Sequence, residues 1–350
     1  MSRRKTRAQQ SADFSRAPAP GVPADGSDRT TALRIGALAG IAVLALAVWY
    51  FFAGRQPGES ASTAGSETVA VATAYVGSQS CAQCHAAESK AWQASQHAGA
   101  MQHATERTVL GNFNDATYNF QGIQSRFFRR DGKYFIRTDG SEGQLADFEV
   151  KYTFGLAPLQ QYLVELPGGR LQAVSVTWDA RPREEGGQRW FRQYPDEKIE
   201  HTDELHWTRR SQNWNFMCAD CHSTQVSKGY DAASDSFKTT YAEISVGCEA
   251  CHGPGSAHLE WAGRKGKDAG KGLTVQLDER RGVTWGRNAA TGQPARSRPR
   301  TTEREIAVCA QCHARRAQIA EGYQPGRPFM DHYLPSLLVP GLYHADGQQQ

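Results

Sequence analysis

The longest hydrophobic run in the sequence lies near its start, over residues 35–53. It reads IGALAGIAVLALAVWYFFA and holds 19 residues without a charge, long enough as a helix to span the hydrocarbon core of a membrane. The run follows a basic lead, and positively charged flanks stay on the cytoplasmic side. The pattern therefore predicts a cytoplasmic basic tail over 1–34 and a transmembrane anchor over 35–53. A buried core helix and a cleaved signal peptide are the alternatives, but the lengths of the lead and of the run favour the anchor.

Past this run the pattern changes twice. Residues 54–74 are mostly Gly, Ser, Ala and Thr, which is typical of a flexible linker. The stretch AAESKAWQASQHAGAMQHAT, from residue 86, is rich in Ala and predicts a helix. Between about 115 and 195 the apolar residues form short runs broken by turns, and SRFFRRDGKYFIRTDG, folding back at Asp131-Gly132, is the clearest hairpin. We expect a mainly α-helical and irregular domain over 75–350 that carries a small antiparallel β insert over about 115–195.

Cysteine usage changes the expected core. Hydrophobic residues make up only 39% of the chain, so aliphatic side chains do not account for a core of ordinary size. All eight cysteines fall in four C-x-x-C-H boxes: box 1 at 81–85, box 2 at 218–222, box 3 at 248–252 and box 4 at 309–313. In this motif two thiols bond the vinyl groups of a haem and the adjacent histidine binds its iron, whereas a zinc ribbon has no trailing histidine. The sequence predicts four covalently attached haem c groups, held by Cys81, Cys84, Cys218, Cys221, Cys248, Cys251, Cys309 and Cys312.

Charge and compartment follow from the same features. Bacteria attach haem covalently outside the cytoplasmic membrane, so the boxes and the apolar run together predict a single-pass inner-membrane protein with its haem domain in the periplasm. The formal net charge is +4, and we expect the charged residues to be spread along the chain. Such a distribution does not indicate nucleic-acid binding. Residues 262–303, rich in Gly, Lys and Arg, are expected to form an exposed loop.

The histidines are the candidate iron ligands. Those that close the boxes are the expected proximal ligands, namely His85, His222, His252 and His313. We expect His97 to be a distal ligand, and because it lies about 18 Å from His85 along a helix, it should serve a different haem. We expect the same of His258, because the Gly-Pro-Gly turn before it is too short to reach the far side of the haem of box 3. Further distal candidates are His206, His332 and the non-histidine Met101.

Three segments also resemble a known family. YVGSQSCAQCHAAESKAWQASQHAGAM, QNWNFMCADCH and GCEACHGPGSAH resemble the multihaem cytochrome c family typified by the tetrahaem electron acceptor of hydroxylamine oxidoreductase. The closer likeness is to membrane-linked members that carry a tetratricopeptide array, and it covers about residues 75–347. The resemblance implies closely stacked and perpendicular haem pairs, mostly bis-histidine irons with one that can be five-coordinate, and distal roles for His97 and His258. Such relatives continue past LYHADGQ into another box and helical repeats, which this sequence does not show.

These observations favour electron transfer. Four haems within about 270 residues lie close together, and a tethered module of this kind would relay electrons between redox partner proteins. One alternative is a reductase or oxidase of a small nitrogen compound at a five-coordinate haem, which would make the protein an enzyme. Another is a haem-lined polymerising scaffold. The sequence leaves the oligomeric state and the identities of electron donor and acceptor open.

Overall fold

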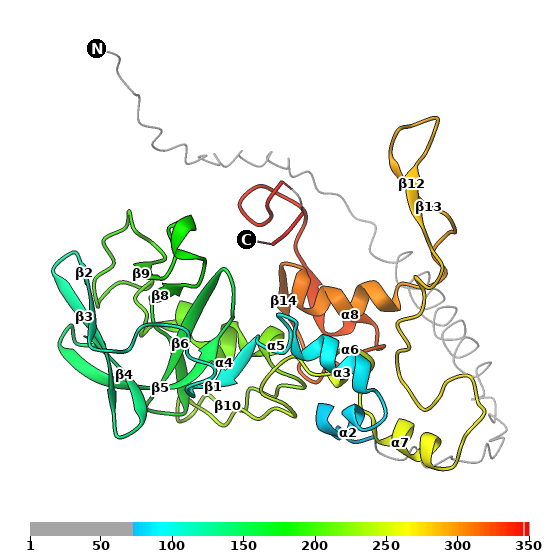
Figure 1. Cartoon of the computed structure of the whole chain (residues 1–350), viewed down its shortest axis with the longest axis horizontal. Coiled ribbons are helices and arrows are strands. Elements are labelled where there is room, and N and C mark those ends of the chain that lie inside the picture. The colour runs from blue at the N-terminus through cyan, green and yellow to red at the C-terminus, as the bar shows by residue number, and fades with distance from the viewer. Residues whose placement is uncertain (1–72, 346, 350) are drawn as a thin grey trace, which may run out of the picture. The chain divides into compact units, whose positions relative to one another are not determined.

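Residues 73–345 and 347–349 are described by a computed structural model of the chain (Figure 1). They belong to one compact unit over 70–350. The predicted basic tail over 1–34, the predicted anchor over 35–53 and nearly all of the predicted linker over 54–74 lie outside the described residues.

A nine-stranded antiparallel sheet is the largest element of this unit. Its strands are β1 (Met101–His103), β2 (Ala116–Phe120), β3 (Ile123–Arg130), β4 (Lys133–Asp139), β5 (Leu145–Phe154), β6 (Leu159–Leu166), β7 (Arg170–Ala173), β8 (Val176–Asp179) and β9 (Arg189–Arg192). They follow the order β2-β3-β4-β5-β6-β8-β9, with β1 on β5 and β7 on β6, so most neighbours in the sheet are also neighbours in sequence. The predicted hairpin is confirmed. Asp131 and Gly132 both have positive φ, 51° and 74°, as the favoured hairpin turn requires.

An aromatic cluster forms the core of the sheet. Phe127, Ile136 and Tyr162 are fully buried. The ring of Trp190 stacks on that of Phe127 with 3.5 Å between their centroids. Buried aromatic rings contribute large apolar areas, so this cluster is a major source of stability. It contains no residue of a C-x-x-C-H box, and the sheet therefore has a core of its own.

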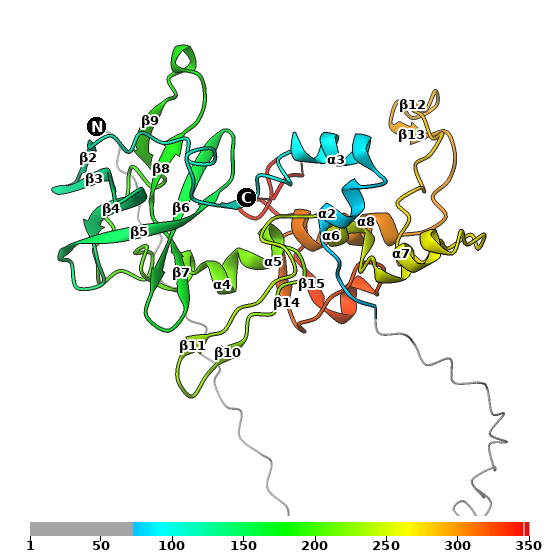
Figure 2. The same cartoon turned by 60° about the horizontal axis from the view of Figure 1, so that its bottom comes forward.

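The helices of the unit are short, and four of them carry the boxes. They are α2 (Ser78–Ala82), α3 (Ala86–Gln93), α4 (Trp214–Met217), α5 (Ala219–His222), α6 (Glu249–His252), α7 (Ser256–Gly263) and α8 (Arg304–His313). Figure 2 shows α2, α3, α6 and α8 gathered together, with α4 next to strand β7. Met101, Leu163, Trp214 and Ala219 pack in one buried cluster. This cluster fastens α5, and with it box 2, to the sheet.

Three short 3-10 helices, Arg183–Glu185, Arg210–Gln212 and Phe329–Asp331, and three two-stranded sheets are also present. The sheets are β10 (Tyr230–Asp231) with β11 (Ser236–Phe237), β12 (Trp285–Arg287) with β13 (Pro294–Arg296), and β14 (Arg316–Gln318) with β15 (Tyr333–Pro335). The pair β12–β13 falls within the segment 262–303 that was expected to be an exposed loop.

The predicted fold class is wrong. We expected a mainly α-helical and irregular domain with a small β insert, but the described chain is mostly β and its longest helix has ten residues. The predicted helix after box 1 ends at Gln93, and the chain then turns into β1, where Met101 pairs with Phe154 of β5. Strand pairing with a distant segment thus overrides the helical preference of an Ala-rich stretch.

The described residues contain no helix that is both long and apolar enough to cross a membrane. A spanning helix needs about 20 residues, twice the length of α8. The predicted single-pass inner-membrane location is corrected accordingly, and the run over 35–53 on which it depended lies outside the described residues.

Candidate functional site

Short helices present the boxes. Boxes 2 and 3 form the single-turn helices α5 and α6, and box 4 forms the last turn of α8. Box 1 begins at the end of α2 and closes at His85, the residue before α3. Residues three apart on a helix share a face, so the two thiols of a box point the same way and the histidine follows directly. All eight cysteines are free thiols, as a haem attachment site requires.

The cysteines of the four boxes lie near one another in a fixed order. The thiol of Cys81 in box 1 lies against that of Cys248 in box 3, and burial and this neighbour raise the pKa of Cys81 to about 11. Burial and Cys309 of box 4 likewise raise the pKa of Cys251 in box 3 to about 11. In box 4, Cys312 interacts with Cys221 of box 2. The four boxes therefore form an unbroken series in the order 1, 3, 4, 2.

A buried carboxylate joins boxes 1 and 3. Glu249, inside box 3, is 2% exposed and accepts hydrogen bonds from the backbone N–H groups of Val76, Gly77 and Gly255. Ser78, in the helix of box 1, accepts a hydrogen bond from the N–H of Cys248 at 3.0 Å. Hydrogen bonds to a charged acceptor are the strong ones, so Glu249 acts as a clamp between the two boxes. Sequence reasoning missed this residue, because an acid inside a box looks like any exposed acid.

An arginine joins boxes 2 and 4. The guanidinium of Arg316 donates to the carboxylate of Asp220 at 2.5 Å and lies over the ring of Tyr333. The hydroxyl of Tyr333 donates to the same carboxylate at 3.1 Å. Gln311, inside box 4, donates to the carbonyl of Ala250 in box 3 at 2.8 Å. Each neighbouring pair in the series thus has its own polar contact.

Two pairs of histidines face one another. The ring centroids of His85 and His258 are 6.1 Å apart with 30° between the ring planes, and those of His97 and His313 are 6.2 Å apart at 82°. Two metal–nitrogen bonds of about 2 Å each, plus the distance from each nitrogen to its ring centre, give a separation of about 6 Å. The separation of the two rings in each pair therefore matches that of two imidazoles bound to one iron. His258 contacts the carbonyl oxygen of Lys271 through Nδ1 at 2.7 Å, which leaves Nε2 free to bind a metal.

Like His258, the other two box histidines contact a backbone carbonyl through Nδ1, but neither faces a second imidazole in the described chain. Nδ1 of His222 contacts the carbonyl of Ala100, and Nδ1 of His252 contacts that of Val275, each at 3.1 Å. A carbonyl acceptor fixes the proton on Nδ1 and leaves Nε2 free to bind a metal. Burial lowers the pKa of His222, which favours the neutral ligand form. Within the described chain, the ring that packs against His222 is Phe154, at 4.2 Å between centroids.

The remaining distal candidates lie elsewhere. His206 is fully buried in the sheet region, where Nε2 contacts Asp139 at 2.9 Å and Nδ1 contacts Thr208 at 2.8 Å, so both ring nitrogens are engaged. His332 contacts the carbonyl of Ala320 and lies beside the ring of Tyr323. Neither forms a ring pair with a box histidine in the described residues. Met101 is buried in β1 and accepts a contact from the hydroxyl of Ser223 at 3.9 Å.

A comparison with known protein families agrees with this chemistry. The family described as Cytochrome c554 and c-prime matches residues 80–119 and 178–253, which hold boxes 1, 2 and 3 and His97. A solved structure, "Crystal Structure of Outer Cell Wall Cytochrome OcwA", is similar with a TM-score of 0.46 and 18% identity over 79% of this chain. This chain covers 48% of that one. No curated protein matches.

These matches do not show that the chain is related to the electron acceptor of hydroxylamine oxidoreductase in particular. That resemblance stays a prediction. The family match and the box chemistry together support assigning the chain to the multihaem cytochromes c, which are electron-transfer proteins with covalently bound haem c.

Proposed function

We propose that this protein is a tetrahaem cytochrome that relays electrons between redox partner proteins, using all four boxes. The observation that carries the proposal is the series of polar contacts that links box 1 to box 3, box 3 to box 4 and box 4 to box 2. Each haem iron, when bound, takes up and releases one electron. The chain's own part is to fix the spacing and orientation of the attachment sites, which Glu249 and Arg316 do at the two ends of the series.

We also propose that His258 is the distal ligand opposite His85, and His97 the one opposite His313. The ring separations of 6.1 and 6.2 Å support this pairing. In each case a segment adjoining one box supplies the ligand of another box. The pairing therefore ties box 3 to box 1 and box 1 to box 4.

Two measurements test this function. A pyridine haemochrome assay should give four haems per chain, and replacing both cysteines of one box by alanine should lower that number to three. Electron paramagnetic resonance of the oxidised protein should show one additional high-spin iron in His97→Ala and in His258→Ala, and two in the double variant. His103→Ala is the matched control, because its exposed ring contacts only Tyr152 among the described rings, and it should add none. Fewer than four haems, or variants that stay low spin, would contradict the proposal.

A second function has one observation in its favour. Within the described chain neither His222 nor His252 faces another imidazole, so the structure leaves room for a five-coordinate iron. Such a site could reduce or oxidise a small nitrogen compound. This second function predicts a high-spin signal from one iron per chain in the unmodified protein, and nitric oxide should bind at the same ratio. It also predicts that the protein reduces nitrite with a reduced dye or oxidises hydroxylamine with an oxidised dye. A protein whose four irons are all low spin would leave only the electron carrier.

A further inference from the structure

The positive charge of the described chain is concentrated in residues 264–304, which we call the basic arm. The arm holds eleven Lys and Arg against four Asp and Glu, whereas residues 73–263 hold 18 against 23. The expectation that charge is spread along the chain is therefore wrong, because the net value of +4 hides this division. The arm lies outside both segments that the cytochrome family matches.

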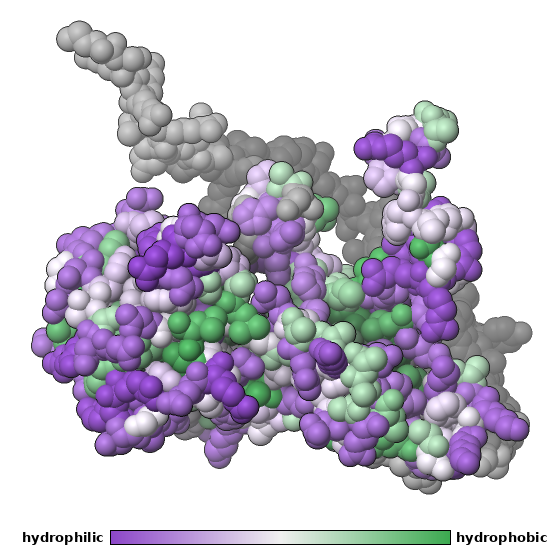
Figure 3. Space-filling view, in the orientation of Figure 1, coloured by the Kyte–Doolittle hydropathy of each residue, from purple (hydrophilic) through white to green (hydrophobic). Residues whose placement is uncertain are grey.

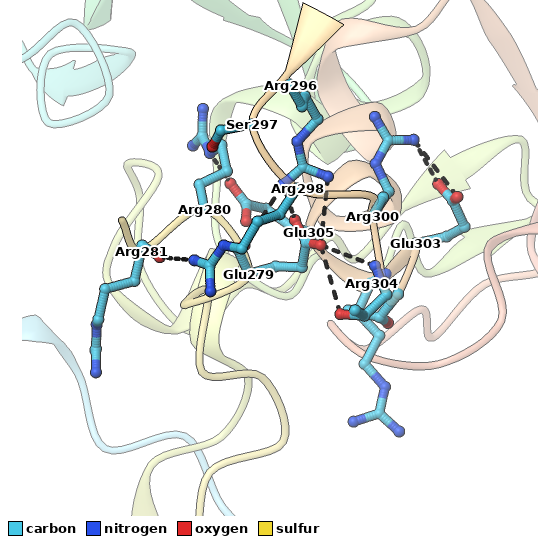
Figure 4. Close-up of polar contacts among 12 residues, drawn as sticks. Glu279, Arg280, Arg281, Arg296, Ser297, Arg298, Arg300, Glu303, Arg304 and Glu305 are labelled. Atoms are coloured by element: carbon cyan, nitrogen blue, oxygen red, sulfur yellow. Dashed lines mark hydrogen bonds and ion pairs between the residues drawn. The ribbon is translucent and has the colours of Figure 1, made fainter. Parts of the chain in front are cut away.

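Ion pairs hold the base of the arm together, and one of them ties it to the helix of box 4. Arg296 pairs with Glu279 at 2.6 Å, and both side chains are about one-tenth exposed, at 11% and 10%. Glu279 also accepts a hydrogen bond from the N–H of Thr301 at 2.9 Å. Arg280 pairs with Glu305 in the first turn of α8, the helix that ends in box 4 (Figure 4). The arm is thus held in place on this helix, even though most of its residues are exposed.

Arg300 of the arm pairs with Glu303, but four other arginines carry charge that no carboxylate of the described chain neutralises. Arg281, Arg287, Arg298 and Arg304 are exposed, and the structure shows no ion pair for them within its described part. Trp285, on the same hairpin as Arg287, is 61% exposed. Figure 3 shows strongly hydrophilic, neutral and mildly hydrophobic surface side by side on this projecting hairpin. Arginine and tryptophan are the residues most enriched at the energetic centres of protein interfaces.

The arm also stands beside a box. A cavity of about 390 Å³ is lined both by Trp285 and Arg296 of the arm and by Cys309 and His313 of box 4. A molecule bound on the arm would therefore lie next to the attachment site of box 4. The unpaired positive charge of the arm could therefore hold a redox partner close to box 4.

We propose that the basic arm is the docking surface for an acidic electron-transfer protein, which it holds beside box 4. This inference rests on the proposed electron-transfer function. Complementary charge steers such partners and raises their association rate by about 10- to 1000-fold, an effect that salt removes. An acidic protein fits better than an anionic membrane or a nucleic acid, because only a redox partner makes use of the neighbouring box.

The test uses two probes that differ in charge alone, native cytochrome c, which is basic, and the same protein succinylated to make it acidic. The reduced full-length holoprotein is mixed with each oxidised probe in a stopped-flow instrument, and one electron passes to the probe at each productive encounter. The variant Arg281→Glu/Arg287→Glu/Arg298→Glu is compared with the control Arg107→Glu/Arg183→Glu/Lys238→Glu. The control makes the same change in net charge at exposed sites that form no ion pair in the described structure.

We expect the acidic probe to react at least about 10-fold faster than the basic one at low salt, and the difference to vanish near 0.5 M salt. The arm variant should lose at least about 10-fold with the acidic probe and the control less than about 3-fold. Equal losses in the two variants, or no loss in either, would overturn the docking proposal while leaving electron transfer intact. Failure to reduce either probe would instead contradict the proposed function. An arm variant that keeps its rate but no longer binds phosphatidylglycerol vesicles would identify a membrane-binding surface and overturn the proposal.

Discussion

Replacing Glu249 by alanine should destabilise the contact between boxes 1 and 3. The carboxylate accepts backbone hydrogen bonds from Val76 at 2.9 Å and from Gly77 and Gly255 at 2.7 Å, and it is 2% exposed. Its removal leaves three N–H groups without their acceptor, at about 1–3 kcal/mol for each one that stays buried. The variant no longer has to bury a charged carboxylate away from water, and this gain in free energy offsets part of the loss. We therefore expect the free energy of unfolding to fall by about 3 kcal/mol, the lower end of the range for breaking a buried charged contact.

Urea unfolding of the holoprotein, followed by Soret absorbance, measures this loss. Glu260→Ala is the matched control, because Glu260 is exposed on α7 and its side chain has no partner in the described chain; it should change the free energy of unfolding by less than about 0.5 kcal/mol. Gly255 directly precedes α7, which carries His258, so Glu249→Ala should also produce a partial high-spin signal. A variant as stable as the control and fully low spin would show that Glu249 is not the clamp.

Two further predictions concern the sheet. Burial alone would raise the pKa of Asp139, but hydrogen bonds from His206 and Thr138 outweigh it and lower that pKa. Because the folded pKa lies below the unfolded value of about 4, this contribution is present above pH 4 and is lost as the pH falls through the folded pKa. The stability difference between wild type and Asp139→Asn should therefore shrink between pH 6 and pH 3, and a difference that stays constant would refute this reasoning. Trp190→Ala removes the ring stacked on Phe127 and should lower the free energy of unfolding by about 3–5 kcal/mol, whereas Trp285→Ala, at a position 61% exposed, should lower it by less than about 0.5 kcal/mol. Urea unfolding followed by fluorescence compares the two variants, and similar losses would count against the aromatic core.

The boxes were readable from the sequence because their chemistry is local. Two thiols three residues apart, with a histidine next to the second, occupy one helical turn whatever surrounds them. The sequence alone did not show which histidine would lie opposite each box histidine. His97 lies opposite His313, which is 216 residues further along the chain, and that distance is closed only by the fold of everything between them.

The sheet shows the same division between local and distant interactions. Asp131-Gly132 determines its hairpin through its own turn preference, so the hairpin could be predicted. The pairing of Met101 with Phe154 depends on a strand about fifty residues away, and it turns a predicted helix into β1. Glu249 is a further case, since its three donors become neighbours only when boxes 1 and 3 are packed together.

The basic arm bears on the proposed ligand His258 as well as on the proposed docking, and this decides which variants can separate the two. Near its start, the carbonyl of Lys271 contacts Nδ1 of His258 at 2.7 Å. Gly272 follows with φ of +67°, and a Cβ there would lie 2.4 Å from the carbonyl oxygen of Ala257, so this close approach to α7 requires glycine. Deleting the arm would therefore disturb the imidazole opposite box 1 along with the docking charge. Reversing the charge of exposed arginines leaves Lys271 and Gly272 in place, so a lower reaction rate in that variant, with its irons still low spin, would isolate docking from ligation.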